Sequence, residues 1–237
     1  AEVLALVRRK KRRFVTMVTL GQLCDPGLME EMAASGCLGV AVGVESVDDD
    51  NCLAVDKQHN VGHDFPGAVR YSNELGIQVA ALLMVGLPLD TPERLARTQR
   101  YLEKVPCSVY DLRILRIYPG SSLYNQMLSR GDVTDTWWLR KEPVPTNHFL
   151  PGHLRVHLKH RHFGPVQLQH STLTLTRELN RMTRESITHV LRVGRRGGAL
   201  KFAAMALTAR SRTAKQARTL LDRVEQAMTA NATRDAV

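Results

Sequence analysis

The sequence predicts an α/β fold in which about four parallel strands alternate with helices, followed by an α-helical carboxyl-terminal region. The first 130 residues alternate short apolar runs and helix signals in the order β-α-β-α-β-α-β-α, which requires right-handed crossovers and a parallel sheet. The runs 38–44 and 77–85 are almost entirely apolar, as is typical of strands buried on both faces. Beyond residue 150, helical periodicity replaces this alternation.

The first strand is expected at 14–20, which is rich in apolar and β-branched residues. Asp25 and Pro26 then provide an N-cap and a proline at the first helical position, and Gly36 ends that helix. The second strand follows and ends at Glu45. The remaining elements are a polar loop at 48–50, a helix at about 65–75, a strand at 77–85, a helix starting at 91–93, a strand at 110–117 and a short helix at 121–129.

The carboxyl-terminal region differs in charge from the rest of the chain. Residues 1–150 carry 17 Lys and Arg against 18 Asp and Glu, whereas residues 151–237 carry 16 against 5. The composition changes near prolines 143, 145 and 151, so we predict two regions, 1–140 and 141–237. In the second region we expect one or two helices up to about 193, an interruption by Gly194 and glycines 197 and 198, and separate helices at 200–208 and 214–228.

The composition is ordinary for a globular protein, with 43% apolar and 24% charged residues. The four cysteines show no paired spacing, which favours reduced thiols in a cytoplasmic protein. No apolar stretch approaches the roughly 18 residues of a membrane span, and no signal peptide is visible.

Candidate site residues follow two of the predicted strands. Ligands of parallel α/β folds bind at the carboxyl ends of strands, which makes Glu45 and Ser46 candidates at the end of one strand. The segment 85–88, which contains Val85, Gly86 and Pro88, ends the next strand along the chain.

Several segments, in this order and spacing, resemble the radical S-adenosylmethionine (radical SAM) enzymes, especially the subgroup with a cobalamin-binding domain. The similarity extends over about residues 1–140. It rests on Asp25 with LMEEM at 28–32, SGC at 35–37, VGVES at 42–46, Lys57, GIQV at 76–79, MVGLPLDTPE at 84–93, IYPGSSLY at 117–124 and the tryptophans Trp137 and Trp138.

The resemblance implies an incomplete (βα)6 TIM-like barrel whose strands three to six lie in this chain, with SAM held over a [4Fe-4S] cluster. It places Glu45 and Ser46 against the ribose and methionine parts of SAM, with Gly43 leaving room for the ligand. It also places the 85–88 backbone near adenine, with free amides to hydrogen bond. The stricter family pattern GxIxGxxE is not kept here, since positions 82, 84 and 89 are Leu, Met and Leu.

The cluster motif CxxxCxxC is absent, so this chain alone should not generate a radical, and we assign it no metal ligands. We expect it to be the carboxyl-terminal part of a longer radical SAM enzyme that performs methylation or rearrangement on a small molecule. Its partner is then the missing amino-terminal half of the barrel or a cobalamin-binding domain, with cobalamin a possible cofactor. The residues identify no catalytic acid or base, no substrate and no oligomeric state.

Two other functions remain open. The chain could be a catalytically inactive remnant or binding module with a basic helical tail, or another barrel enzyme of the aldolase type. The aldolase reading expects a lysine at a strand end, whereas Lys57 falls in a loop. Nucleic-acid binding by the tail is possible but disfavoured, because few aromatic residues accompany its charges. His153, His157 and His160 have the spacing of one helical face, which we read as a solvated basic face in preference to a metal site.

Overall fold

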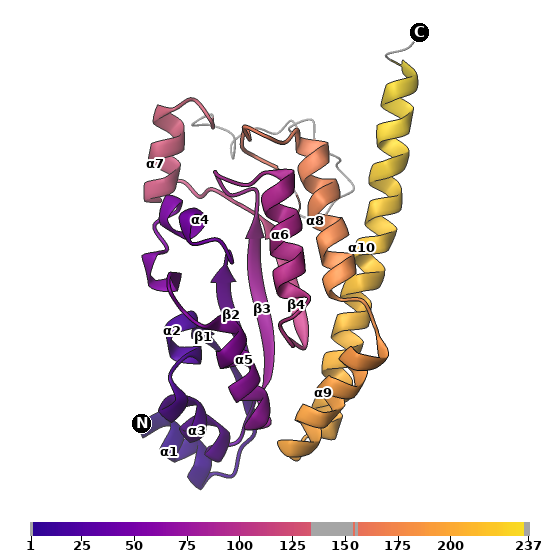
Figure 1. The fold of residues 1–237 in the computed structure, drawn as a ribbon. Helices are drawn as coiled ribbons and strands as arrows, with labels where there is room; N and C mark the ends of the chain where they lie inside the picture. The colour runs from indigo at the N-terminus through magenta and orange to yellow at the C-terminus, as the bar shows by residue number, and fades with distance from the viewer. Residues whose placement is uncertain (1, 134–153, 155, 235–237) are drawn as a thin grey trace.

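A computed structural model describes residues 2–133, 154 and 156–234 of the chain. Its first part consists of α1 (Glu2–Arg9), β1 (Phe14–Thr19), α2 (Leu20–Leu23), α3 (Pro26–Ala34), β2 (Cys37–Glu45), α4 (Asp49–Ala54), η1 (Gln58–Asn60), α5 (Phe65–Glu74), β3 (Gln78–Val85), α6 (Pro92–Leu102), β4 (Val109–Ile114) and α7 (Ser122–Ser129). The carboxyl-terminal part consists of α8 (Pro165–Leu179), α9 (Arg184–Arg196) and α10 (Leu200–Arg234). Figure 1 shows α5 and α6 against the sheet and α8, α9 and α10 beyond β4.

The four strands form one sheet in the order β1-β2-β3-β4, and every neighbouring pair is parallel. Thr19 pairs with Gly43, and Gly43 pairs with Leu82, so the carboxyl ends of β1, β2 and β3 lie together at the same end of the sheet. The predicted fold class is therefore confirmed: an incomplete, TIM-like (βα) barrel followed by helices.

The two faces of β2 differ in side-chain size. On the covered face, valines at 40, 42 and 44 of β2 and apolar residues of β3 and β4 are buried in the core. On the opposite, inner face, β2 presents Gly39, Ala41 and Gly43, none of which extends beyond a methyl group. The register places Val15 and Met17 of β1 beside them, and these two residues are 58% and 69% exposed. The inner face thus remains partly open on the side of β1.

The edge of the sheet formed by β4, on the side away from β1, is closed by the carboxyl-terminal helices. Asn180, the C-cap residue of α8, accepts a hydrogen bond from the Tyr110 amide at 3.0 Å and donates to the Tyr110 carbonyl at 2.7 Å. It therefore replaces a neighbouring strand at the free edge of β4. The ring of Phe202 in α10 lies 3.0 Å from the place that a Cβ on Gly39 would take, so the start of α10 contacts the inner face.

Four details differ from the sequence-based expectations. α10 is one continuous helix from 200 to 234, where we expected two. Gly194 lies inside α9, and a Cβ there would come within 2.3 Å of the Ala203 Cβ, so this glycine permits close packing of α9 on α10. The polar 48–50 segment forms the N-terminus of α4. β4 ends at 114, three residues earlier than predicted.

The histidine-rich segment is not a helix over its described residues. Around His157 and His160 the chain is irregular, and apolar side chains at 156, 158 and 163 are buried. His160 contacts the Leu87 carbonyl through Nε2 at 2.9 Å, so the expected solvated helical face is wrong at this position. His148, His153, Trp137 and Trp138 lie outside the described residues.

None of the described helices is both long enough and apolar enough to cross a membrane.

Candidate functional site

The backbone at the end of β2 is strained. Glu45 has φ = 63°, a left-handed conformation that costs a residue with a Cβ about 1–2 kcal/mol. The pairing of β2 with β3 is irregular between Gly43 and Glu45, and the Asn60 amide donates to the carbonyls of Gly43 and Val44 at 3.1 Å each. The surrounding structure therefore maintains a conformation that local preference disfavours, as happens most often at functional sites.

The irregular turn places the Glu45 carboxylate over the inner face of the sheet. A Cβ on Gly43 would lie only 3.3 Å from Glu45 Oε1, so the missing side chain of Gly43 leaves the space that the carboxylate borders. Glu45 Oε1 lies 3.3 Å from Lys57 Nζ, and the two side chains are 21% and 36% exposed. The carboxylate thus has a cationic neighbour and retains access to solvent.

Ser46 contributes to the turn that follows. Its hydroxyl accepts a hydrogen bond from the Asp48 amide at 3.1 Å, and its carbonyl lies 3.6 Å from the Cys52 thiol. These contacts lead the chain from β2 into α4. The Ser46 side chain is half-buried, and its hydroxyl hydrogen remains available to a ligand.

The turn after β3 differs from the expectation drawn from the resemblance. The amides of Gly86 and Leu87 both donate to Asp90 Oδ2, at 2.7 and 3.0 Å, so they are not free to bind adenine. A Cβ on Gly86, whose φ is +85°, would come within 2.8 Å of Leu168 in α8. Val85 is buried and Pro88 is half-buried. In this turn, Pro88 is the predicted site residue that keeps side-chain access to solvent.

A buried polar pair connects the two strand ends. Asn51 in α4 donates to Asp90 Oδ1 at 2.8 Å and accepts from the Leu89 amide at 3.0 Å, and both Asn51 and Asp90 are buried. Burial raises the pKa of the Asp90 carboxyl, while its hydrogen bonds oppose that rise. The structure therefore brings the turns after β2 and β3 together through two residues that we did not select from the sequence.

The cysteines do not fit a [4Fe-4S] cluster. Cys37 starts β2, Cys52 lies in α4 beyond the other end of that strand, and Cys107 precedes β4. Burial raises the pKa of the Cys37 thiol to about 11 and that of Cys107 to about 12, which disfavours the thiolate that iron binds. Within the described residues, no group of three or more potential ligands gathers around one point.

We therefore expect anaerobic reconstitution of this chain with iron and sulfide to leave it colourless. After desalting, the visible spectrum should show no thiolate-to-iron absorption, and iron analysis should return less than one iron per chain. A stable brown protein containing stoichiometric iron would contradict the assignment of these thiols as structural.

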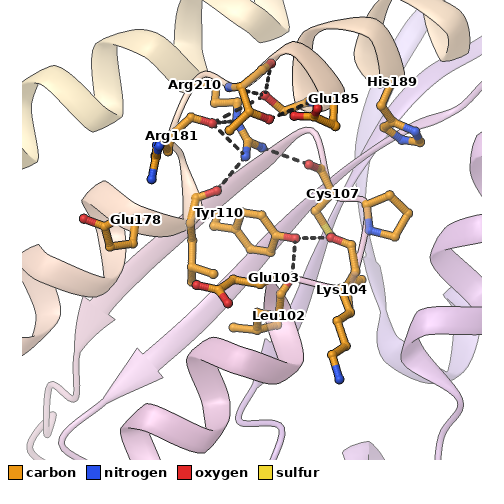
Figure 2. Close-up of a pocket in the computed structure, with 15 residues that line it drawn as sticks. Leu102, Glu103, Lys104, Cys107, Tyr110, Glu178, Arg181, Glu185, His189 and Arg210 are labelled. Atoms are coloured by element: carbon orange, nitrogen blue, oxygen red, sulfur yellow. Dashed lines mark hydrogen bonds between the residues drawn. The ribbon is translucent and has the colours of Figure 1, made fainter.

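A cavity of about 450 Å³ lies at the amino end of β4 (Figure 2). Arg210 of α10 is buried there and donates to four backbone carbonyls, while the Tyr110 hydroxyl donates to the Leu102 carbonyl at 2.9 Å. Burial raises the pKa of both Tyr110 and Cys107, so neither serves as a nucleophile near neutral pH. The groups in this cavity thus hold the carboxyl-terminal helices to the sheet, and the cavity lies at the opposite end of the strands from Glu45.

A parallel sheet with helices on one face and a partly open inner face is typical of incomplete (βα) barrels. Residues 1–102, a little under half of the chain, match the family model of the Radical SAM superfamily. The superfamily implies SAM and a [4Fe-4S] cluster. The strand-end groups at Gly43 and Glu45 suit a ligand with hydroxyls or an ammonium, whereas the cysteines do not suit the cluster.

Curated relatives match only part of the chain. Over 113 residues it is 26% identical to the hopanoid C-2 methylase of Rhodopseudomonas palustris, and this alignment covers 48% of this chain and 21% of the relative. It is 22% identical over 138 residues to the bacteriochlorophyllide d C-8(2)-methyltransferase of Chlorobaculum tepidum, covering 58% of this chain and 31% of the relative. It is 28% identical over 127 residues to the tRNA uridine(34) acetyltransferase of Dehalococcoides mccartyi, covering 54% of this chain and 26% of the relative. The chain thus spans between a fifth and a third of the length of these relatives.

Two solved structures of the radical SAM methyltransferase TsrM from Kitasatospora setae share the fold. The structure with tryptophan substrate and a SAM analogue bound has a TM-score of 0.50 at 18% identity, covering 65% of this chain and 30% of TsrM. The structure with cobalamin and a [4Fe-4S] cluster bound has a TM-score of 0.52 at 16% identity, covering 92% and 49%. These similarities concern the fold alone.

Proposed function

We propose that this chain forms one side of the SAM pocket of a radical SAM enzyme. Gly43, Glu45 and Ser46 border the ribose and methionine parts of SAM, and the turn that contains Val85, Gly86 and Pro88 borders the adenine. The observation that carries the proposal is the strained, partly exposed Glu45 at the carboxyl end of β2. A carboxylate there accepts two hydroxyl hydrogen bonds or pairs with an ammonium group, and such bonds are short and strong.

Lys57 has a specific part in this proposal. Its ammonium lies 3.3 Å from one Glu45 oxygen and holds the carboxylate in place, while the second oxygen remains available to the ligand. The turn after β3 acts through its shape, since its two amides are bound to Asp90. Pro88 supplies the apolar contact for the base.

The radical chemistry requires groups that this chain does not supply. A bound [4Fe-4S] cluster supplies the electron that cleaves SAM, and its cysteine ligands then belong to another segment of the enzyme, such as the missing half of the barrel. We propose methylation or rearrangement of a small molecule as the reaction, with cobalamin as a further cofactor. Residues 1–140 form the barrel part in this proposal and 141–237 a basic helical extension. Its cytoplasmic location stays a prediction.

The proposal predicts that SAM binds this chain and that Glu45→Gln weakens binding by about tenfold or more. The substitution keeps the shape of the side chain and removes its charge, and hydrogen bonds to charged groups contribute about 1.5–3 kcal/mol. Saturation-transfer NMR with SAM reports contact with the ribose and adenine protons, and a titration gives the affinity.

Glu31→Gln provides the matched control, because Glu31 is an exposed acid on α3. It should bind SAM as the unaltered chain does. Equal SAM affinity in Glu45→Gln and the unaltered chain would contradict the assignment of Glu45.

A second candidate function is a catalytically inactive remnant or binding module. The separated, buried thiols favour it for this chain taken alone. The same NMR experiment distinguishes the two, because a remnant that has lost its ligand gives no saturation transfer to SAM, whereas a pocket-forming chain does.

A further inference from the structure

We propose that a groove between β4, α8 and α10 binds an amphipathic anion, meaning a molecule with a phosphate or carboxylate head and an apolar body. This "α10 groove" has a volume of about 540 Å³, which lies within the common range for small-molecule sites. Its floor is formed by Leu112, Leu154, Leu173 and Leu220, and Arg212, Lys215 and Arg223 lie on its rim. The proposal is independent of the SAM pocket, since none of the strand-end residues lines this groove.

The floor suits the apolar body of such a molecule. Leu112 comes from β4, Leu173 from α8 and Leu220 from α10, and Leu154 lies in the segment before α8. The leucines of β4, α8 and α10 converge from three directions, and all four leucines belong to or pack against the main hydrophobic core. A ligand chain placed here extends the core and loses apolar contact with water.

The rim suits an anionic head. Arg212 and Lys215 are three residues apart on one helix, so their side chains leave neighbouring points of its surface. The ion pairs found among the described residues include neither of them. Among the described residues, the acid that lines the groove is Asp111, which is held by Arg113 at 2.8 Å. In this described part of the chain, Arg212 and Lys215 therefore line the groove beside its apolar floor without a carboxylate partner.

The position of Arg223 gives the ligand a direction. It lies eleven residues beyond Arg212 on the same helix, a rise of about 16 Å, which is too far for both to contact one head group. The Arg212 and Lys215 pair thus binds the head, and the body runs along Thr219 and Leu220.

The test is isothermal titration calorimetry of the full chain with decyl phosphate below its micellar concentration. Decanoate, decanol and inorganic phosphate are titrated as separate arms. We expect one decyl phosphate per chain, with decanol and inorganic phosphate each at least about tenfold weaker, since each lacks one of the two interactions. Comparison of decyl phosphate with decanoate distinguishes a phosphorylated lipid from a fatty acid as the source of the ligand.

Three variants locate the binding. Arg212→Gln with Lys215→Gln should weaken decyl phosphate at least about tenfold and leave decanol unchanged. Lys201→Gln with Arg218→Gln removes the same charge from exposed positions of α10 outside the groove and should change neither affinity. Thr219→Trp fills the groove from an exposed position and should abolish binding of both decyl phosphate and decanol.

Two results would overturn the proposal. One is equal loss of binding in the two double variants, which indicates attraction to the overall charge of the helix. The other is decyl phosphate that binds no more tightly than inorganic phosphate. Circular dichroism of each variant shows whether a loss of binding reflects loss of fold.

Discussion

Replacing Arg210 by methionine is expected to lower the free energy of unfolding by about 3–5 kcal/mol, although the residue is distant from the proposed SAM pocket. The guanidinium donates to the carbonyls of Cys107 at 3.0 Å, Ser108 at 3.2 Å and Leu179 at 2.6 Å, and more weakly to Arg181 at 3.4 Å. Methionine fills a similar volume and leaves these buried acceptors without their donor, at a cost of about 1–3 kcal/mol each when no water replaces it.

Arg210 is unusual because it is buried and has no carboxylate partner among the residues that the structure describes. Burial lowers its pKa, and the ring of Tyr110, whose centroid lies 5.8 Å from the guanidinium carbon, is its aromatic neighbour. The carbonyl dipoles that surround it take the place of a counter-ion. Two of the carbonyls precede β4, one belongs to the last residue of α8 and one lies two residues beyond it, so this one side chain joins the carboxyl-terminal helices to the sheet.

The measurement is urea unfolding followed by circular dichroism, together with amide hydrogen exchange. Arg210→Lys should recover only part of the loss, since a lysine cannot reproduce the planar fork of donors. Arg212→Met, two residues further along the same helix and exposed, should change stability by less than about 0.5 kcal/mol. If Arg210→Met proves as harmless as Arg212→Met, the role assigned to Arg210 is wrong.

The prediction of two helices in place of α10 is wrong for the same physical reason that Arg210→Met is expected to be destabilising: the helix depends on tertiary contacts. We expected separate helices at 200–208 and 214–228, so the segment that contains Arg210, Ser211 and Arg212 fell between them. Local sequence gives no sign that one of those arginines is buried against carbonyls more than a hundred residues away. The continuous helix depends on tertiary contacts, which override the local pattern.

The strands were easier to predict than the connections. Almost entirely apolar runs at 38–44 and 77–85 indicate strands buried on both faces, and the structure places both in the centre of the sheet. Helix starts such as Asp25 with Pro26 and Thr91 with Pro92 could also be predicted from the sequence, because an N-cap and a first-turn proline act within a few residues. Gly194 was misread because a glycine that permits helix contact resembles one that ends a helix.

The strand-end residues could be located from the sequence, but their surroundings could not. The position of Glu45 follows from where an apolar run ends, whereas its φ of 63° and its contact with Lys57 depend on the fold. Asn51 and Asp90 are 39 residues apart, and neither was selected as a site residue from the sequence. An acid four residues after a glycine-containing turn is the only signal that could have suggested Asp90 as the acceptor of the turn amides.

The pair formed by Asn51 and Asp90 leads to the second prediction of large effect. Asp90→Asn should cost about 2 kcal/mol, because an amide at this position can satisfy only some of its neighbours. If its oxygen accepts from the amides of Gly86 and Leu87, its NH₂ group faces the Asn51 NH₂ group. Reversing the Asn51 amide removes that conflict, but the Leu89 amide then loses its acceptor.

Exchanging the two residues should restore stability. In the double variant Asn51→Asp, Asp90→Asn, the new carboxylate accepts from the Leu89 amide and from the new Asn, while the Asn oxygen serves the turn amides. We expect this variant to lie within about 1 kcal/mol of the unaltered chain, and the double-mutant cycle to give a coupling energy of about 2 kcal/mol or more. Urea unfolding at neutral pH of all four proteins provides the cycle. Additive losses would contradict the hydrogen-bond directions assigned here.

Within this cycle, the single variant Asn51→Asp gives the largest expected change and a pH dependence of known sign. It places two buried carboxylates against each other, at a cost of about 3 kcal/mol at neutral pH.

In the unaltered chain burial already raises the Asp90 pKa above 3.8, so the folded protein takes up that proton before the unfolded chain does as pH falls. The contribution of Asp90 to stability therefore increases on acidification through its folded-state pKa and levels off below 3.8. A second carboxylate raises the pKa of the pair further, so the destabilisation of Asn51→Asp should shrink between neutral pH and about pH 5, whereas the exchanged variant keeps the pH profile of the unaltered chain. A pH-independent deficit in Asn51→Asp would show that the two side chains do not face each other.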